Sequence, residues 1–291
     1  MKDFSHWKEY EGASEGSGRS EKKWLINPDT NQTGLFKRKK DVGTTDHVSE
    51  CIASDLAKLI DVPCACFEIG LFHDWEGSMS YNIVEHERMT LIEGIYCISR
   101  LYSNFDVEKL MDIQTGERYS LEMIKKVMDI FNLFDEFLPI LIFDFLIGNT
   151  DRHQSNWAFI MENNELRLSP LYDNSSSLCA YVPESKIEQY LGKDQMLWKS
   201  LVDTKSKSII RINSNDEKLP THATVLRFLV QNYYNQIKKI VNNIDQFVTK
   251  NKIYDILEKY SEVLSEKRKQ LIMKFLLSKK EIMIDIYKRK E

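Results

Sequence analysis

The chain has 291 residues, of which 42% are hydrophobic and 29% are charged, and its formal net charge at pH 7 is −4. This composition is typical of a folded globular protein and excludes global disorder, and the length allows one two-lobed domain or two small ones. The weak net charge gives no reason to expect direct binding to nucleic acid or to a membrane.

The five cysteines form no CxxC pair and no even set, which favours reduced thiols in a cytoplasmic protein. The first twenty residues lack the basic start and apolar run of a secretory signal. The longest apolar stretch, residues 137–148, contains a proline and an aspartate and is too short to span a bilayer. We therefore expect a soluble protein located in the cytoplasm.

Residues 1–86 alternate short apolar runs with turn-forming residues. The segments 24–26 and 34–37 are separated by seven turn formers, which predicts a β-hairpin. Apolar residues at helical spacing predict a helix over 46–60, capped by Thr45 or Asp46, and strands are expected at 64–69 and 79–85. This part of the chain is interpreted as a small sheet crossed by one helix.

Residues 87–291 have mostly helical periodicity. Residues 120–147 are periodic, with Pro139 expected to kink or split the helix, and 224–248 and 254–289 are long amphipathic patterns. The exception is 149–173, which predicts a loop, a strand at 157–161, a turn, a strand at 165–168 and a second loop. The expected fold is therefore α+β and two-lobed, like a protein kinase, with a small β-rich N-lobe (1–86) and a larger helical C-lobe (87–291).

The segment Gly148-Asn149-Thr150-Asp151-Arg152-His153-Gln154-Ser155-Asn156 carries the residues most suited to chemistry. Phosphoryl transfer needs one carboxylate to accept the proton of the attacking hydroxyl, and a second carboxylate with a neutral oxygen ligand to hold Mg²⁺. Asp151 has the position of the base, Asn156 that of the amide ligand, and Asp173, beyond the 157–168 hairpin, that of the metal carboxylate.

The alternative is that Asp151 and Asn156 are ordinary loop formers. An Asp followed five positions later by Asn arises about once by chance in a chain of this length, so this pair alone carries no weight. The run Asp-Arg-His-x-x-Asn is rarer by roughly three orders of magnitude, and it lies between an apolar helix and a hairpin. These features favour the catalytic interpretation.

The motif Gly-Asn-Thr-Asp-Arg-His-x-x-Asn, followed by an apolar strand and Leu-Ser-Pro-Leu-Tyr-Asp, resembles the HipA-like serine/threonine kinases of bacterial toxin–antitoxin systems. Its core is also similar to the phosphatidylinositol-kinase superfamily. The resemblance implies that Asp151 is the catalytic base and that Asn156 and Asp173 bind Mg²⁺. In the family a Phe or Leu usually follows the second metal Asp, whereas Asn174 follows it here.

The N-terminal region is expected to bind the nucleotide. Gly12, Gly16 and Gly18 could form a loop over the phosphates, because glycines let backbone N–H groups approach anionic oxygens. This segment matches no strict phosphate-loop template, and a mobile N-terminal segment is the alternative. The resemblance implies a lysine after such a loop, and Lys22 or Lys23 would match it.

Lys37 follows the apolar pair Leu35-Phe36, where kinase-like folds place the lysine that neutralises the α- and β-phosphates. Glu50, in the predicted 46–60 helix, is its expected partner, although Lys37 could equally belong to a solvated basic run with residues 38–40. The hinge that contacts adenine through backbone groups is expected near the end of the sheet, at the three residues Val84, Glu85 and His86.

The leading hypothesis is an ATP- and Mg²⁺-dependent serine/threonine protein kinase of the HipA-like toxin type, acting on a cytosolic protein. A kinase for a small molecule or lipid headgroup, and a non-catalytic binding module with a kinase fold, are the alternatives. The lack of a membrane-facing basic patch counts against the lipid version. By resemblance alone, a HipB-like antitoxin is a possible partner.

Overall fold

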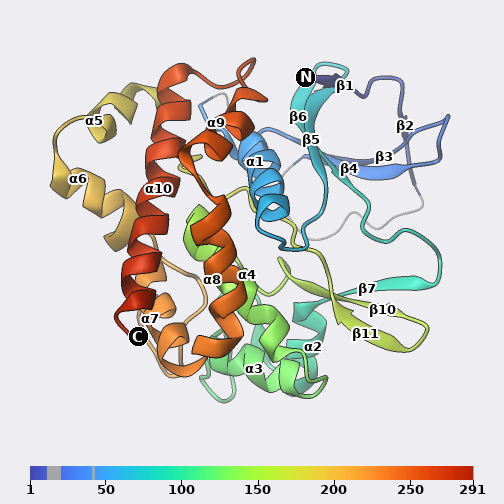
Figure 1. The fold of residues 1–291 in the computed structure, drawn as a ribbon. Helices are drawn as coiled ribbons and strands as arrows, with labels where there is room; N and C mark the ends of the chain where they lie inside the picture. The colour runs from blue at the N-terminus through green and yellow to red at the C-terminus, as the bar shows by residue number, and fades with distance from the viewer. Residues whose placement is uncertain (12–20, 41–42, 291) are drawn as a thin grey trace.

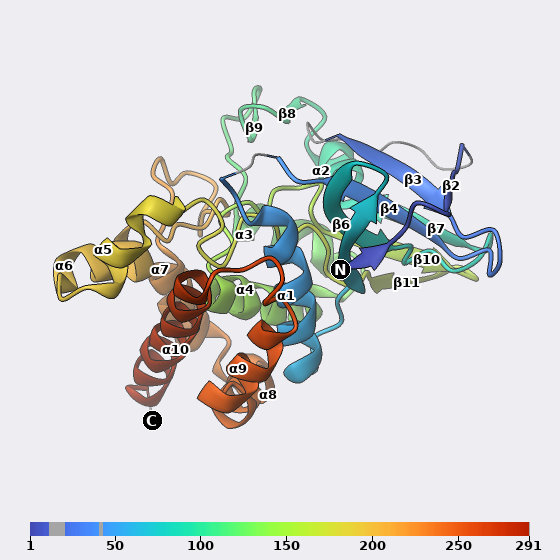
Figure 2. The same cartoon turned by 90° about the horizontal axis from the view of Figure 1, so that it is seen from above.

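The computed structural model describes residues 1–11, 21–40 and 43–290 and shows an α+β fold with two parts (Figure 1). A curled β-sheet forms one part, and a larger, mostly helical part packs beside it. Figure 2 shows the same division from above, with the helices α5, α6 and α10 on the side away from the sheet. The two-lobed α+β architecture expected from the sequence is confirmed.

The larger sheet has six strands in the order β1-β5-β6-β4-β3-β2. Its strands are β1 (Lys2–Asp3), β2 (Lys8–Glu9), β3 (Lys22–Ile26), β4 (Thr33–Arg38), β5 (Phe67–Phe72) and β6 (Trp75–Tyr81). All neighbours are antiparallel except β1 and β5. The β3–β4 hairpin agrees with the prediction. Leu25 and Phe36 are buried in a small core of this sheet, separate from the main core.

Strands β5 and β6 differ from the predicted segments 64–69 and 79–85. The hairpin turns at residues 73–74, where His73 has a positive φ of 53°, and Phe72 is paired with Trp75. Strand β5 therefore begins three residues later than predicted, and β6 begins four residues earlier. The apolar side chains of 64–66 do not belong to the sheet: Cys64 forms only an isolated bridge with Leu171.

Helix α1 (Asp46–Leu59) is the helix predicted over 46–60, and it lies between the sheet and the helical part (Figure 1). Thr45 is at its N-cap, but no side chain in the described part of the chain caps the helix by a hydrogen bond. A three-stranded sheet, in the order β11-β10-β7, joins β7 (Met89–Glu93) to the predicted hairpin of β10 (Ala158–Glu162) and β11 (Glu165–Leu168). The short helix α2 (Gly94–Leu101) follows β7, and β8 (Phe105–Asp106) pairs with β9 (Met111–Asp112).

Helix α4 (Phe134–Ile147) is the centre of the helical part and is buried almost along its whole length. The helices around it are α3 (Leu121–Asp129), α7 (His222–Asn232), α8 (Tyr234–Phe247) and α10 (Glu266–Lys288). Pro139 lies inside α4. The predicted split occurs instead at residues 130–133, where Asn132 adopts a left-handed conformation that asparagine tolerates better than most residues.

The long C-terminal patterns are also divided. Residues 224–248 fall into α7 and α8, which meet at Tyr233, and 254–289 fall into α9 (Lys250–Glu258) and α10. The hydroxyl of Ser265 accepts a hydrogen bond from the N–H of Arg268, a side-chain cap that starts α10. Shorter elements lie on the outer edge: a 3-10 turn (Glu184–Lys186), α5 (Ile187–Leu191), α6 (Gln195–Lys199) and a π turn (Ser200–Thr204).

No helix within the described ranges combines the length and the apolar composition needed to cross a membrane.

Candidate active site

The loop that carries Asp151 leaves the C-terminal end of α4 at Gly148. Gly148 has a φ of +67°, and its N–H bonds back to carbonyls in the last turn of the helix. A Cβ atom at this position would lie 2.7 Å from Cζ of Phe275 in α10. Glycine is therefore required here both by the backbone conformation and by the close approach of α10.

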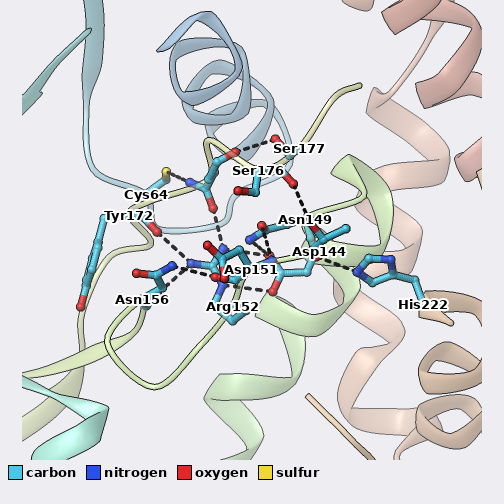
Figure 3. A network of polar contacts seen from close by, with 12 residues as sticks. Cys64, Asp144, Asn149, Asp151, Arg152, Asn156, Tyr172, Ser176, Ser177 and His222 are labelled. Atoms are coloured by element: carbon cyan, nitrogen blue, oxygen red, sulfur yellow. Dashed lines mark hydrogen bonds and ion pairs between the residues drawn. The ribbon is translucent and has the colours of Figure 1, made fainter. Parts of the chain in front are cut away.

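Arg152 is the buried anchor of this loop. Its guanidinium donates two hydrogen bonds to the Asp144 carboxylate in α4, at 3.0 and 2.8 Å, and both side chains are almost fully buried. It also donates to the carbonyl oxygens of Asn156 (2.7 Å) and Tyr172 (2.8 Å), and to Oδ1 of Asn174 (2.5 Å). One side chain thus connects α4 to both loops that contain the predicted catalytic residues (Figure 3).

Asn149 fixes the backbone that precedes Asp151. Its Nδ2 donates to Oδ1 of Asp144 (3.0 Å), and its Oδ1 accepts from the N–H of Asp151 (3.1 Å). Burial raises the pKa of Asp151 above its ordinary value of 3.8, and the negative charge of Asp173 contributes in the same direction to a smaller extent. The nearby His153 opposes this shift. A carboxylate with a raised pKa is a better proton acceptor than an ordinary one.

Asn156 lies beside Asp151 at the end of the same loop. Its Nδ2 donates to the backbone carbonyl of Asp151 at 2.7 Å, which fixes the orientation of the amide. The amide oxygen is consequently left for a cation. The five-residue spacing that suggested this arrangement does place the two residues together.

Asp173 lines the same cleft and follows β11, in a left-handed conformation with φ of 53°. Its Oδ2 is 3.2 Å from Nζ of Lys37 in β4, so this ion pair joins the sheet to the helical part. Burial alone would raise the pKa of Asp173, but the charge and hydrogen bond of Lys37 outweigh it and hold the pKa below the ordinary value. Asp173 is therefore ionised at neutral pH.

Glu50 was expected to pair with Lys37, and in this respect the expectation is wrong: the ion pair of Lys37 is with Asp173. Oε2 of Glu50 accepts instead from the N–H of Asn174 (2.8 Å), and its Oε1 has no hydrogen-bond partner among the described residues. Burial raises the pKa of Glu50 to about 8, although the nearby charge of Lys37 opposes this. A largely protonated Glu50 is a weaker partner for Lys37 than the ionised Asp173.

These residues share one cleft of about 1040 Å³, whose lining includes Lys37, Glu50, Asp151, Asn156 and Asp173. A smaller cavity of about 180 Å³ adjoins it and shares Lys37, Asn156 and Asp173. Its other walls are mostly apolar and include Leu35, Ala65, Phe67, Tyr81, Leu91 and Tyr172. A charged cleft beside an apolar pocket suits a ligand with a phosphate end and a flat apolar end.

The predicted hinge residues do not line either of these two cavities in the described part of the chain. The N–H of Val84 bonds to Oδ1 of Asn82, and His86 pairs with Glu162 at 3.0 Å. The segment that lines the apolar pocket is 80–83, which ends β6 and comes just before Val84, Glu85 and His86. The shift follows from the position of β6, which ends at Tyr81 and not at residue 85. Gly12, Gly16 and Gly18 lie outside the described residues.

A divalent cation fits the donor set of Asn156 and Asp173. Both provide oxygen atoms, which Mg²⁺ prefers, and Mg²⁺ typically takes its remaining ligands from water and phosphate. Among the described residues, no group of three or more His, Cys, Asp or Glu side chains is arranged to hold a metal ion. The expected cation would therefore depend on one carboxylate and one amide.

Asn174 and Lys40 were not predicted as site residues. Asn174 is fully buried and joins Arg152 to Glu50 through its side chain and its N–H. The sequence did contain a signal for this role, because Asn174 follows Asp173 at a position where the related family usually has Phe or Leu. Lys40 lines the cleft, and its position in the run 37–40 gave no means of separating it from its neighbours.

The chain is similar to a known protein kinase in sequence and in structure. A curated relative, the serine/threonine-protein kinase CtkA of Helicobacter pylori, is 25% identical over 152 residues. The match spans 52% of this chain but only 45% of that relative. The crystal structure of the H. pylori proinflammatory kinase CtkA superposes with a TM-score of 0.81 at 19% identity, covering 99% of this chain and 98% of the other.

A second solved structure, the Shewanella oneidensis toxin–antitoxin complex of HipA, HipB and operator DNA, matches with a TM-score of 0.61 and 15% identity. It covers 96% of this chain and 68% of the matched chain. These two likenesses confirm the fold. The family model described as the HipA-like C-terminal domain matches residues 14–250. That match includes every described residue of the cleft named above, and the chain belongs to the HipA-like C-terminal domain family.

Proposed function

We propose that this chain is a protein kinase that transfers the γ-phosphate of ATP to a serine or threonine hydroxyl of another protein. The observation that carries the proposal is that Asp151, Asn156, Asp173 and Lys37, from three separate segments, line a single cleft. The named relative, a serine/threonine-protein kinase, supports the choice of substrate class.

In this proposal Asp151 orients the acceptor hydroxyl and takes its proton. The hydroxyl oxygen forms a bond to the γ-phosphorus, the bond from that phosphorus to the bridging oxygen breaks, and its electron pair leaves with ADP. Lys37 is placed to neutralise phosphate charge, because its ammonium group is held in the cleft by an ionised carboxylate. Catalysis then consists of positioning and charge stabilisation, without a covalent enzyme intermediate.

Asn156 and Asp173 are the residues that would hold Mg²⁺. The ion, when bound, supplies positive charge that screens the phosphates from the attacking hydroxyl. The bond from Asn156 to the Asp151 carbonyl keeps the proposed ligand and the proposed base at a fixed separation. Both Arg152 and Asn174 are buried behind them and keep the two loops together.

A cytosolic protein substrate, a toxin role and a HipB-like antitoxin partner extend the proposal, and their support is resemblance to HipA. The matched HipA structure contains HipB and operator DNA. The expectation that this chain does not itself contact nucleic acid therefore stays a prediction. Purification of the chain from its native cells, followed by identification of bound proteins and nucleic acid, would test whether it has a HipB-like partner and whether it contacts nucleic acid.

The kinase proposal is tested by incubating the purified chain with Mg²⁺, γ-³²P-labelled ATP and a cell lysate. Label is expected in protein bands with the wild type, and at least 100-fold less with Asp151→Asn and Asp173→Ala. The matched control is Asp255→Asn, an exposed aspartate of α9, which is expected to behave as the wild type.

Three outcomes separate the alternatives. Label in a small-molecule or lipid fraction indicates a different phosphoacceptor. The absence of label with the wild type as well as with the variants indicates a binding module. A wild-type rate for Asp151→Asn would show that another group accepts the proton. Retention of ATP binding by Asp151→Asn, measured by calorimetry, is expected because the base lies on the acceptor side of the reaction.

A further inference from the structure

Helix α10 contains a lysine buried beneath the catalytic loop. Lys279 is 1% exposed, and its Nζ lies 4.4 Å from the ring centroid of Phe145 in α4 and 5.6 Å from that of Phe275. It forms no ion pair with a carboxylate of the described residues. Lysine is rarely buried without a charged partner, because removing the ammonium group from water is costly. Its one hydrogen bond to a described residue is with Oγ of Ser206, at 2.8 Å.

The hydroxyl of Ser206 also contacts the ring of His222. Oγ of Ser206 is 2.9 Å from Nδ1 of His222, at the start of α7, and Nε2 of His222 is 2.7 Å from the backbone carbonyl oxygen of Asn149. Ser206 and His222 are 5% and 3% exposed. Figure 3 shows His222 reaching the Asn149–Asp151 segment from the side opposite Tyr172. The series of contacts therefore ends at Asn149, whose side chain accepts the hydrogen bond of the Asp151 N–H.

The chemistry of the groups fixes the direction of every hydrogen bond in this series. A carbonyl oxygen can only accept, so Nε2 of His222 carries a proton. Burial and the charge of Lys279 lower the pKa of His222 to about 3, so the ring is neutral and Nδ1 must accept from Ser206. The hydroxyl oxygen of Ser206 is then free to accept from Lys279.

Among the described residues, the other hydrogen bonds of Asn149 itself go to α4 and to the catalytic loop. Its N–H bonds to the carbonyl of Asp144 (2.9 Å), and its side chain bonds to Asp144 and to the N–H of Asp151. The bond from His222 ties the Asn149 peptide to α7 and, through Ser206, to α10. The N–H of Thr150, in the same peptide unit, donates to the carbonyl of Ser176 (3.1 Å) and is its second anchor. Rotation of that peptide would move Asp151, which is two residues further along.

We propose that Lys279, Ser206 and His222 are positioning residues whose one-directional hydrogen bonds fix the Asn149 peptide and thereby aim Asp151 into the cleft. None of the three lines the cleft, so they act through Asn149. The C-terminal helix α10 thus becomes part of the phosphotransfer machinery. The catalytic consequence rests on the proposed kinase function, whereas the hydrogen-bond series does not.

The first test is the tautomer of His222, which is independent of activity. In two-dimensional NMR spectra of the ¹⁵N-labelled chain, with His222→Gln used for assignment, we expect a neutral ring protonated at Nε2 throughout pH 6–8. A ring protonated at Nδ1, or one that titrates in this range, would overturn the proposal.

The second test measures exchange of the Asp151 amide hydrogen with solvent. Ser206→Ala removes the central hydroxyl, and we expect the Asp151 N–H to exchange at least 10-fold faster. The matched control is Ser208→Ala in the same loop, because Ser208 is also buried and accepts from the N–H of Ile210 but does not touch His222. Equal exchange rates in the wild type and Ser206→Ala would contradict the proposal.

The third test is kinetic and adds the catalytic consequence. Ser206→Ala and Lys279→Met are each expected to lower kcat about 10-fold or more while changing KM for ATP less than twofold, since small displacements of a catalytic group act on the chemical step. Ser206→Thr, which keeps the hydroxyl, is expected to restore kcat. Lys274→Met is the control on α10, because Lys274 lies over Trp198, away from the loop.

The outcomes separate this inference from the kinase proposal. If the wild type transfers no phosphate, the function fails while the tautomer and exchange data still decide the hydrogen-bond series. If the wild type is active and Ser206→Ala keeps the wild-type kcat, the positioning role is wrong even if the variant melts at a lower temperature. If Lys279→Met fails to fold, Ser206→Ala and Ser206→Thr decide.

Discussion

Arg152 illustrates how much of the site depends on a single buried side chain. It satisfies the Asp144 carboxylate and holds the Asn156 carbonyl and the Asn174 side chain at the same time. A planar guanidinium with five donors can do this, and a lysine cannot. The Asp-Arg pair in the motif therefore contains one residue that faces the cleft and one that supports it from behind.

Replacing Arg152 by Met should destabilise the fold by about 3–5 kcal/mol, because the Asp144 carboxylate would remain buried without its charged partner, keeping the amide of Asn149 as a donor. The free energy of unfolding in urea measures this loss. The double variant Asp144→Asn with Arg152→Met should recover part of it, since the uncompensated charge is then absent. A loss below about 1 kcal/mol for the single variant would show that the pair contributes little.

The raised pKa of Asp151 predicts the pH dependence of activity. The base must be ionised to accept a proton, so kcat/KM should fall as the pH falls through a pKa above the ordinary value of 3.8. Lys40→Met should move this acid limb to still higher pH, because the charge of Lys40 lowers the pKa of Asp151. A kcat/KM that stays constant down to about pH 4 would contradict the assignment.

The sequence allowed the placement of Asp151, Asn156 and Asp173, because one short motif and one hairpin determine their positions. It did not predict that Lys37 pairs with Asp173, since that contact joins segments 136 positions apart in the chain (37 and 173). The partners of Asn149 could not be predicted either: His222 begins a distant helix and has no metal-binding or catalytic spacing. Contacts of this kind follow only from the packing of α7 and α10.

At the scale of elements, periodicity predicted helices and strands better than it predicted their ends. The hairpin of β10 and β11 and the helix α1 agree with the prediction to within about one residue. The break before α4 and the break before α10 were missed, because apolar spacing continues across both. They are set by local backbone features, the left-handed Asn132 and the capping hydroxyl of Ser265.

Substitution of Gly94, the residue that follows β7, tests how the three-stranded sheet supports the catalytic loop. A Cβ atom at Gly94 would lie 2.4 Å from the ring of Trp157, whose Nε1 donates to Tyr119, and Tyr119 in turn donates to the Arg152 carbonyl. Gly94→Ala should therefore destabilise the fold by about 1–3 kcal/mol and lower activity.

The control for this substitution is Gly43→Ala, because no atom of the described residues lies within 4 Å of a Cβ at Gly43. Thermal melting and phosphotransfer assays on both variants measure the difference. Equal stability of the two variants would show that the ring of Trp157 can move aside without cost.

For the whole molecule, the site depends on contact between the sheet and the helical part. Lys37 comes from β4, whereas Asp151, Asn156 and Asp173 come from the helical part and its hairpin. The proposed boundary at residue 86 stays a prediction; β7, which follows it, pairs with β10 of the hairpin and not with the larger sheet. The cleft would therefore change shape if the two parts moved relative to each other.

The buried Lys279 predicts how the stability of the whole molecule depends on pH. Burial lowers its pKa to about 7 from the ordinary 10.5, against the weaker influence of Asp203 and Cys179. The folded state thus binds this proton less tightly than the unfolded chain, so stability should rise with pH between about 7 and 10.5. At ~1.4 kcal/mol per pKa unit, the gain is on the order of 5 kcal/mol.

The measurement is urea unfolding at several pH values, with Lys279→Met beside the wild type. The difference between the two should vary with pH as described, because methionine does not titrate, while Lys288→Met, at an exposed lysine of α10, should follow the wild type. A pH-independent difference would show that Lys279 keeps its proton in the folded state.

The central claim is that Asp151, Asn156, Asp173 and Lys37 form one phosphotransfer site. A crystal structure of the chain with Mg²⁺ and a non-hydrolysable ATP analogue tests it most directly. We expect a cation ~2.1 Å from oxygens of both Asn156 and Asp173, Lys37 on the phosphates, and Asp151 facing the γ-phosphate. Nucleotide bound outside this cleft, or a cation that touches neither Asn156 nor Asp173, would contradict the account.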